Sequence, residues 1–276
     1  MMKYIGFAFL LLINLSQSVH AIDPDREYIR TPDAGNWPYE ALKITTEDKI
    51  KLNTWIYEAD KTKNKNTVIV LAYPDAGNMS YFVYHAWIMA KAGYTVVTFD
   101  YRGFGKSDDF TINKSALYHT EFITDLTAIV DNIYTRFQDK KIGIWAMSMG
   151  SIITSRAYPS IKGKIDFIIG EGYVTDTSAI IDKYQAQEKH LDLPEASGTY
   201  MNSIQSINIP MLIFTASEDT ITTHEDALKL KDKLGDTCHI IQYQAAHLQG
   251  FQYLYESKGF GGWYMEQIDA FIKSIS

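Results

Sequence analysis

Residues 142–150 read IGIWAMSMG, an apolar run that leads directly into a serine followed by a methionine and a glycine. A short run that is apolar at every position is typical of a strand buried between layers of helices. The next residues, 149–157, place their apolar side chains at helical spacing. Ser148 is therefore predicted to lie in a sharp turn between a buried strand and a helix.

The same alternation of apolar runs and amphipathic segments continues along the chain. Further buried strands are predicted at 67–72, 95–99, 165–169 and 211–215, with a last, alternating strand at 238–243. Helices are expected at 81–91, 117–137, 149–157, 224–234 and 263–275. Such alternation predicts an α/β fold, a mostly parallel sheet with helices on both faces, in which ligands bind beyond the C-terminal ends of the strands.

Three segments depart from this alternation. Residues 42–45 and 51–58 alternate between apolar and polar side chains and predict an antiparallel pair of strands. Residues 22–40 are polar, contain three prolines, and are expected to form an irregular leader. Residues 174–209 predict an insertion with a helix-like stretch at 177–187. Because no repeat or linker divides the chain, we expect a single domain over residues 22–276.

The composition and charge exclude several classes of protein. With 46% hydrophobic and 21% charged residues, the chain is neither disordered nor a coiled coil. Its net charge of −7 and the lack of a long basic run argue against binding to nucleic acid or anionic membranes. The single cysteine, Cys238, cannot form an internal disulfide, and no His-Glu-x-x-His or similar cluster predicts a metal. We expect neither a metal nor another cofactor.

Residues 1–21 have the pattern of a cleaved signal peptide. Lys3 precedes an apolar core at 4–15, and polar residues and Val19-His20-Ala21 follow it. The core is shorter than the roughly 18 residues that a membrane span needs. We therefore expect export to the periplasm or the exterior, with no stable membrane anchor after cleavage.

The turn at Ser148 has the features of a nucleophile elbow. Ala146 and Gly150 are small, which permits a strained turn and close packing of the following helix on the strand. A serine hydroxyl is a poor nucleophile at neutral pH and needs a base that is oriented by an acid. We expect both partners to follow later strands, because those strands end at the same edge of the sheet.

Two residues fit those roles. Asp219 follows the strand at 211–215, and His247 follows the strand at 238–243. The chain order Ser, Asp, His is the order of α/β-type serine hydrolases. The acids that compete with Asp219 are Glu218 beside it, and Glu171 and Asp176 after the preceding strand.

With these motifs in place, the chain resembles the α/β hydrolases, near the serine-aminopeptidase-like enzymes with a small cap. The resemblance covers about residues 40–275 and rests on the following stretches: 73–78 (YPDAGN), 100–107 (DYRGFGKS), the Ser148 elbow, and the loops of Asp219 and His247. It implies an eight-stranded type of sheet and a cap over 174–209 that determines substrate choice.

The resemblance also implies roles for individual residues. Ser148 becomes the nucleophile, His247 the general base and then acid, and Asp219 the group that orients His247. The backbone N–H groups of Met149 and Asp75 become the oxyanion hole. This chain departs from the family by having Tyr73-Pro74 where His-Gly is usual and Ala146 where glycine is usual.

Three functions are compatible with these residues. The first is hydrolysis of an acyl ester or thioester of small-molecule size through an acyl-enzyme. The second is a serine-aminopeptidase-like peptidase, which needs an acidic anchor for the substrate amine, with Glu171, Asp176 and Asp75 as candidates. The third is a non-catalytic binding protein on a hydrolase fold. The short cap favours a small acyl pocket over a large lipase lid.

Overall fold

The computed structural model describes residues 21–275. The predicted signal peptide, apart from Ala21, lies outside the described residues. Within the described residues, the model contains no helix that is both long enough and apolar enough to span a membrane.

An eight-stranded sheet forms the centre of the molecule, in the order β10-β9-β8-β7-β4-β6-β3-β2. All neighbours from β6 to β10 pair in parallel, whereas β2 and β3 are antiparallel to each other and β3 is antiparallel to β6. The strands are β2 (Tyr39–Thr45), β3 (Lys51–Tyr57), β4 (Thr67–Ala72), β6 (Thr95–Phe99), β7 (Lys141–Met147), β8 (Phe167–Glu171), β9 (Met211–Ala216) and β10 (Cys238–Tyr243). The predicted mostly parallel α/β sheet is therefore confirmed.

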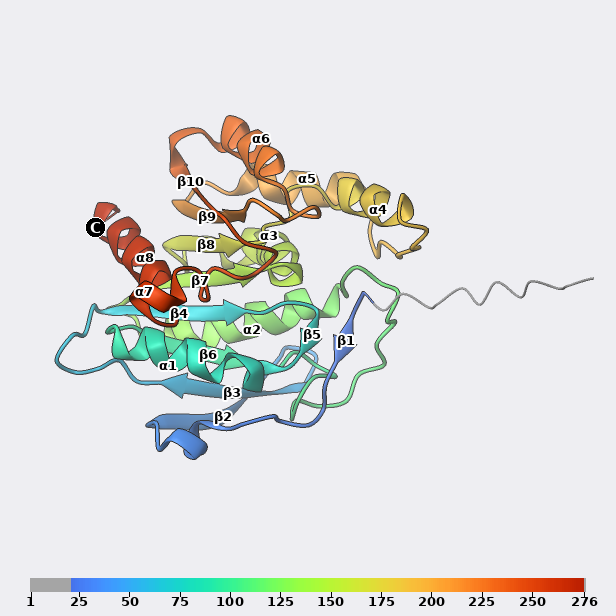
Figure 1. Cartoon of the computed structure of the whole chain (residues 1–276). Helices are drawn as coiled ribbons and strands as arrows, with labels where there is room; N and C mark the ends of the chain where they lie inside the picture. Colours follow the sequence, from blue (N-terminus) through green and yellow to red (C-terminus); the bar gives the residue numbers. More distant parts are fainter. Residues whose placement is uncertain (1–20, 276) are drawn as a thin grey trace, which may run out of the picture.

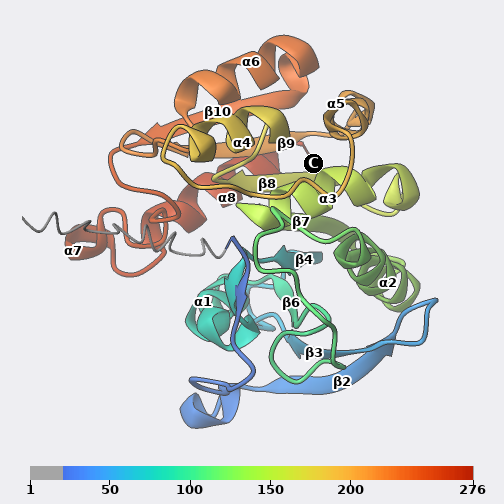
Figure 2. The same ribbon diagram turned by 90° about the vertical axis from the view of Figure 1, so that its right-hand side faces the viewer.

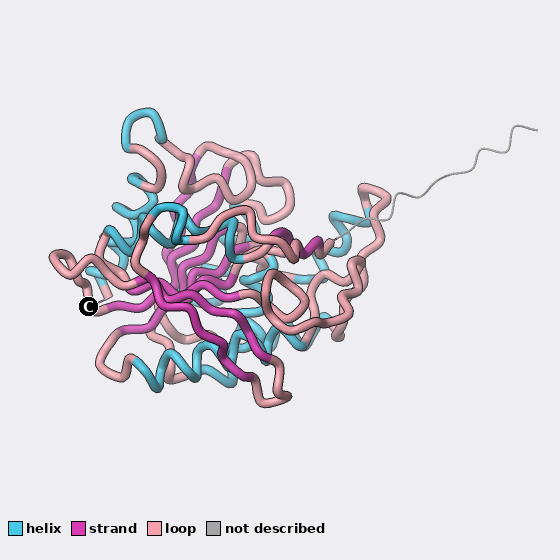
Figure 3. The backbone as a smooth tube through the Cα atoms, turned by 90° about the horizontal axis from the view of Figure 1, so that it is seen from below, coloured by secondary structure: helices cyan, strands magenta, loops and turns pink. Residues whose placement is uncertain are grey.

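Helices cover both faces of this sheet. The helices are α1 (Val83–Lys91), α2 (Glu121–Arg136), α3 (Met149–Ile161), α4 (Thr177–Gln185), α5 (Ser197–Ser206), α6 (His224–Leu234), α7 (Tyr255–Lys258) and α8 (Gly262–Ser274). Figure 2 shows α1 and α8 on one face and α2 and α3 on the other. The strands twist as they cross the molecule (Figure 3), as expected of a parallel sheet.

The sheet is buried because its strands are apolar on both faces. Every residue of β4, β6, β8 and β9 is buried. Helix α2 shows the complementary pattern, since its buried residues Phe122, Leu126, Ile129 and Ile133 form one stripe at helical spacing. The core that results spans the length of the described chain and holds the ends of the strands in fixed positions.

Several element boundaries differ from the predicted ones, and two of the differences have a clear cause. The helix expected over 117–137 begins at Glu121, because Leu117 donates its N–H to the carbonyl of Asp192 in the insertion. The strand expected over 165–169 runs from Phe167 to Glu171. In both places, pairing with a segment that is distant in the sequence determines where the element begins or ends. The local pattern of apolar residues cannot predict such a boundary.

The leader is not irregular throughout, and this prediction was wrong in part. Strand β1 (Asp23–Pro24) pairs in parallel with β5 (Ala76–Gly77), which follows β4. Ile22 is fully buried. Figure 1 shows β1 beside β5 at the end of the molecule where the insertion helix α4 also lies. The leader thus packs against the loop that follows β4, at the edge of the sheet where the predicted site lies.

Candidate active site

Ser148 occupies a strained turn between β7 and α3. Its φ of 48° and ψ of −117° are unfavourable for a residue with a side chain. Its N–H donates to the carbonyl of Glu171 at 3.1 Å, which fixes the turn to the end of β8. Helix α3 starts at Met149 immediately afterwards, as predicted. The hydroxyl is consequently presented at the C-terminal edge of the sheet, next to the positive end of the α3 helix dipole.

Asp219 lies in the loop after β9 and is held by its own turn. Its Oδ1 accepts the N–H groups of Ile221 and Thr222 at 2.9 and 3.0 Å, and its Oδ2 accepts the Thr222 hydroxyl at 2.5 Å. Burial alone raises the pKa of this carboxyl, but hydrogen bonds from His247 and Thr222 lower it to about 2. Asp219 is therefore ionised and rigidly oriented.

His247 lies in the loop after β10 and faces Asp219. Its Nδ1 is 2.5 Å from Asp219 Oδ2. This contact assigns the Nδ1 proton to the aspartate side and leaves Nε2 as the nitrogen that can accept a proton. Burial favours the neutral ring, but the hydrogen bond and charge of Asp219, with the charges of Glu171 and Asp75, raise the pKa of His247 above 6.5.

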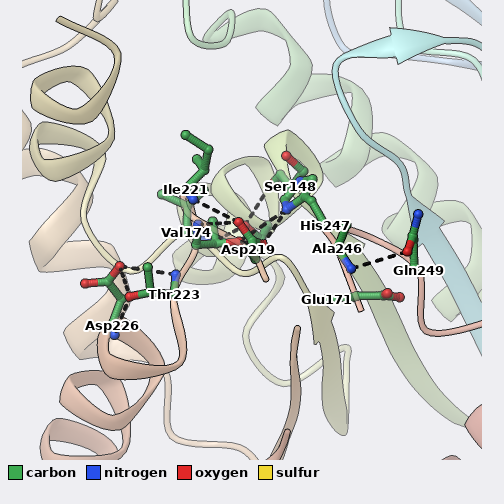
Figure 4. A network of polar contacts seen from close by, with 12 residues as sticks. Ser148, Glu171, Val174, Asp219, Ile221, Thr223, Asp226, Ala246, His247 and Gln249 are labelled. Atoms are coloured by element: carbon green, nitrogen blue, oxygen red, sulfur yellow. Dashed lines mark hydrogen bonds and ion pairs between the residues drawn. The ribbon is translucent and has the colours of Figure 1, made fainter. Parts of the chain in front are cut away.

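The structure brings these three predicted residues together from separate loops. Figure 4 shows Ser148, Asp219 and His247 gathered at one place. Asp75 and Met149 line the same small cavity as Ser148, a cavity of about 40 Å³. The two residues whose backbone N–H groups were assigned to the oxyanion hole therefore line the same cavity as the serine.

The competing acids do not contact His247 through a hydrogen bond. Glu218 is exposed to solvent next to Asp219. The carboxylate of Asp176 caps α4 by accepting the N–H groups of Ser178 and Ala179. Glu171 is buried, and its Oε1 accepts the Tyr243 hydroxyl at 2.7 Å. Among the four acids considered, geometry selects Asp219 as the partner of His247.

The rest of the small cavity is largely apolar. Leu117 and Ile152 line it from the body, and Ile180, Tyr184 and Leu191 line it from the insertion. Helices α4 and α5 occupy residues 174–209, and this segment contributes Ile180, Tyr184 and Leu191 to the cavity lining. A larger groove of about 890 Å³ lies between β2 and α2, but none of the three clustered residues lines it.

The loop that carries Asp75 is fixed from two sides. The N–H of Asp23 in the leader donates to the Asp75 carbonyl at 2.9 Å. The buried carboxylate of Asp100 accepts the Met79 N–H at 3.0 Å and the Tyr28 hydroxyl at 2.5 Å. Burial raises the pKa of the Asp75 carboxyl above its ordinary value, and the charge of His247 opposes that rise.

Several residues of this site could not be identified from sequence. Thr222 supports Asp219, and the Asp-x-x-Thr spacing that permits this is a local signal that could have been used. Ala21, Val174 and Ile221 also line the cavity, each from a different segment. No local pattern distinguishes these apolar residues from ordinary core residues.

The raised pKa of His247 predicts a specific pH dependence. Only the neutral imidazole accepts a proton from serine, so activity requires a pH above the pKa of the histidine. Because the contact with Asp219 raises that pKa, kcat/KM with a p-nitrophenyl ester should fall on acidification with a midpoint above pH 6.5. The measurement is a rate profile from pH 5 to 9, and a midpoint below 6.5 contradicts the arrangement.

Part of the chain is similar in sequence to known proteins. Residues 68–172 match the model of the serine aminopeptidase S33 family, a region that contains Ser148 and ends before Asp219 and His247. An uncharacterized membrane protein of Saccharomyces cerevisiae, YNL320W, is 36% identical over 84 residues, which are 30% of this chain and 28% of the relative. YfhR of Escherichia coli K12, also uncharacterized, is 34% identical over 74 residues, 26% of each protein. The aligned stretches thus span less than a third of these relatives.

Solved structures resemble the chain over most of its length. The esterase Pf2001 of Pyrococcus furiosus has a TM-score of 0.71 and 21% identity, and the match covers 92% of this chain and 100% of that one. An α/β serine hydrolase without lid from Xanthomonas campestris has a TM-score of 0.57 and 14% identity, covering 76% and 85% of the two chains. These likenesses show that the chain has the fold of the α/β hydrolases.

Proposed function

We propose that the protein is a serine hydrolase that cleaves a small acyl ester or thioester through an acyl-enzyme intermediate. The observation that carries the proposal is the contact of 2.5 Å between His247 Nδ1 and Asp219 Oδ2, in loops that meet at the strained turn of Ser148. A serine on a strained elbow beside a histidine–aspartate pair is the arrangement that activates a hydroxyl for acyl transfer.

The proposed reaction begins when Ser148 Oγ attacks the substrate carbonyl carbon. The serine proton moves to His247 Nε2, and Asp219 stabilises the imidazolium that forms. The N–H groups of Met149 and Asp75 donate to the oxygen that becomes negative. As the tetrahedral intermediate collapses, the leaving alcohol or thiol takes the proton from His247, and water then releases the acyl group by the reverse sequence of proton transfers.

The size and lining of the cavity support a short acyl group. The space beside Ser148 is about 40 Å³ and is bordered mainly by aliphatic side chains such as Ile152, Ile180 and Leu191. Apolar substrate groups gain free energy by leaving water for such a surface, and long chains require a larger space. Esters and thioesters are favoured over amides, because an amide nitrogen must be protonated before it leaves.

One observation favours the peptidase alternative. Of the acidic side chains considered as anchors for a substrate amine, Glu171 is fully buried and Asp176 caps α4, but Asp75 lines the cavity with Ser148. A carboxyl group in that position could bind an ammonium group on the acyl side of the substrate. The family match over residues 68–172 is consistent with this second candidate.

A fluorophosphonate probe tests the proposed chemistry. The protein should be labelled at neutral pH, and the Ser148→Ala variant should lose the label because the attacking oxygen is absent. Ser257→Ala serves as a control, since it removes an exposed serine hydroxyl that donates to the Leu254 carbonyl and does not line the cavity. Labelling of wild type and Ser148→Ala to the same extent, or no labelling of either, would contradict the serine-hydrolase proposal.

A substrate series then separates the two candidates. We expect p-nitrophenyl acetate and butyrate to be hydrolysed faster than the octanoate, and aminoacyl-anilides to be poor substrates. Faster turnover of anilides than of esters would instead support the peptidase alternative. If the protein is labelled by the fluorophosphonate but hydrolyses only long-chain esters, the argument from the small cavity is contradicted. The assignment of Ser148 as the nucleophile would still stand.

A further inference from the structure

Glu171, at the end of β8, has a buried carboxyl group that the proposed reaction does not use. Its side chain is 1% exposed. Its Oε1 accepts two hydrogen bonds of 2.7 Å, one from the Tyr243 hydroxyl and one from the N–H of Gly250. Tyr243 ends β10, and Gly250 belongs to the loop that carries His247. The carboxyl group therefore ties the histidine loop to the centre of the sheet.

The backbone of the same segment packs directly on the histidine. Gly172 has a φ of +59°, and a Cβ at this position would lie 2.5 Å from His247 Cε1. A Cβ on Gly250 would lie 2.9 Å from Glu171 Oε1. Both glycines are thus needed for the close approach of β8 to the histidine loop. Figure 4 shows Glu171 next to the segment that contains Ala246, His247 and Gln249.

Glu171 also contacts the nucleophile turn. Its backbone carbonyl accepts the N–H of Ser148 at 3.1 Å. One residue therefore bonds to the turn of the proposed nucleophile through its main chain and to the loop of the proposed base through its side chain. Errors of 1 Å in the relative position of two such groups cost large factors in rate.

The Glu171 carboxyl group and the His247 ring each have several polar or acidic neighbours. Glu171 Oε2 is buried as well, and the hydroxyl of Tyr264 on α8 faces the carboxyl group. His247 is faced by Asp219 from the loop after β9, by Glu171 from β8, and by Asp75 from the loop after β4. Burial raises the pKa of Glu171, whereas donors from Tyr243 and Gly250 and the charge of His247 oppose that rise.

We propose that Glu171 is a positioning residue for His247, which holds the histidine loop through Gly250 and adds a second negative charge that stabilises the imidazolium. The proposal rests on the proposed function, in which the proton leaves Ser148 Oγ for His247 Nε2 as the bond from oxygen to carbonyl carbon forms. A carboxylate close to that ring favours its charged form, even though Asp219 makes the hydrogen bond.

The Glu171→Gln variant tests the charge without changing the shape. Glutamine retains an oxygen that accepts the bonds from Tyr243 and Gly250 but carries no charge. We expect the variant to fold, its kcat/KM for a p-nitrophenyl ester to fall about threefold to tenfold, and its acidic midpoint to move about 0.5 to 1 pH unit lower. Glu218→Gln removes the same charge at an exposed position and should leave the midpoint unchanged.

The outcomes separate this inference from the function on which it rests. If the fluorophosphonate probe labels the wild type but Glu171→Gln has the same kcat/KM and the same pH profile as the wild type, only the role of Glu171 is overturned. If the probe does not label the wild type, the proposed function itself is overturned. If Glu171→Gln does not fold, Glu171→Asp keeps the charge but shortens the reach to Gly250. We expect Glu171→Asp to have a lower kcat than the wild type and the same acidic midpoint in its pH profile. A kcat equal to that of the wild type would refute the positioning role.

Discussion

The Asp219→Asn variant is expected to fold and to lose about 10⁴-fold in kcat. An asparagine amide at this position donates a hydrogen bond to His247 Nδ1 rather than accepting one. The ring is then held with its proton on Nε2, and in that tautomer it cannot accept the proton of Ser148. The loss therefore arises from orientation and proton position, not from removal of the base itself.

The contacts around Asp219 indicate that Asp219→Asn preserves the turn in which the residue lies. Oδ1 accepts the N–H groups of Ile221 and Thr222, and an asparagine carbonyl can accept the same bonds. The turn should thus persist, and circular dichroism together with the melting temperature checks that it does. Steady-state kinetics on a p-nitrophenyl ester gives kcat for wild type and variant.

Glu218→Gln is the matched control for this substitution. It changes an acid to its amide one residue away, on a side chain that is exposed to solvent. We expect its kcat to stay within about twofold of wild type, since surface changes away from a site have small effects. If Asp219→Asn instead keeps more than a tenth of the activity, another carboxyl group orients the histidine, and Glu171 and Asp75 are then the candidates.

Much of the fold could be predicted because the apolar pattern within each strand is enough to identify it. Strands β4, β6 and β10 begin and end at the predicted residues. Helix α6 does so as well, because Thr223 forms a capping box at its start and Gly235 follows its end. In each case the information lies within the segment or its immediate neighbours.

Other boundaries depend on contacts with remote segments. Strand β1 is two residues long and contains a proline, so nothing in its sequence predicts a strand. It exists because the backbone of β5, more than fifty residues later, offers the partners. The start of α2 is likewise determined by the pairing of Leu117 with Asp192.

The site shows the same division between local and remote information. The convergence of Ser148, Asp219 and His247 follows from the topology, since all three follow parallel strands that end at one edge. The choice among acids does not follow from the sequence. Glu171 was as well placed in the chain as Asp219, but Tyr243 and Gly250 hold its carboxyl group in the core, and both lie more than seventy residues away.

Replacement of Gly150 by alanine should lower the free energy of unfolding by about 3 kcal/mol or more. A Cβ at this position would lie 1.9 Å from the carbonyl oxygen of Ala72 and 2.9 Å from that of Tyr73. Both atoms belong to backbone at the end of β4, which cannot rotate away as a flexible side chain can. Either α3 or the end of β4 must move, and Asp75 lies three residues after that strand end.

Gly198→Ala is the matched control for Gly150→Ala. Gly198 is also the second residue of its helix, α5, but no atom lies within 4 Å of a Cβ built on it. Because alanine has the higher helix propensity, we expect this variant to be within about 0.5 kcal/mol of wild type, on the stable side. Urea denaturation of the two variants isolates the clash from the intrinsic cost of replacing glycine.

The expected shift is large enough to measure by heating as well. For a domain of this size, 3 kcal/mol corresponds to a melting temperature lower by about 6 to 12 °C. The folded fraction of Gly150→Ala should also lose fluorophosphonate labelling, because the displaced strand end carries the proposed oxyanion donor at Asp75. Equal stability of Gly150→Ala and Gly198→Ala would show that α3 does not pack against β4 as closely as described. In that event the strained turn at Ser148 would need another explanation, since close packing of α3 on the strand end is what holds the serine at φ 48°.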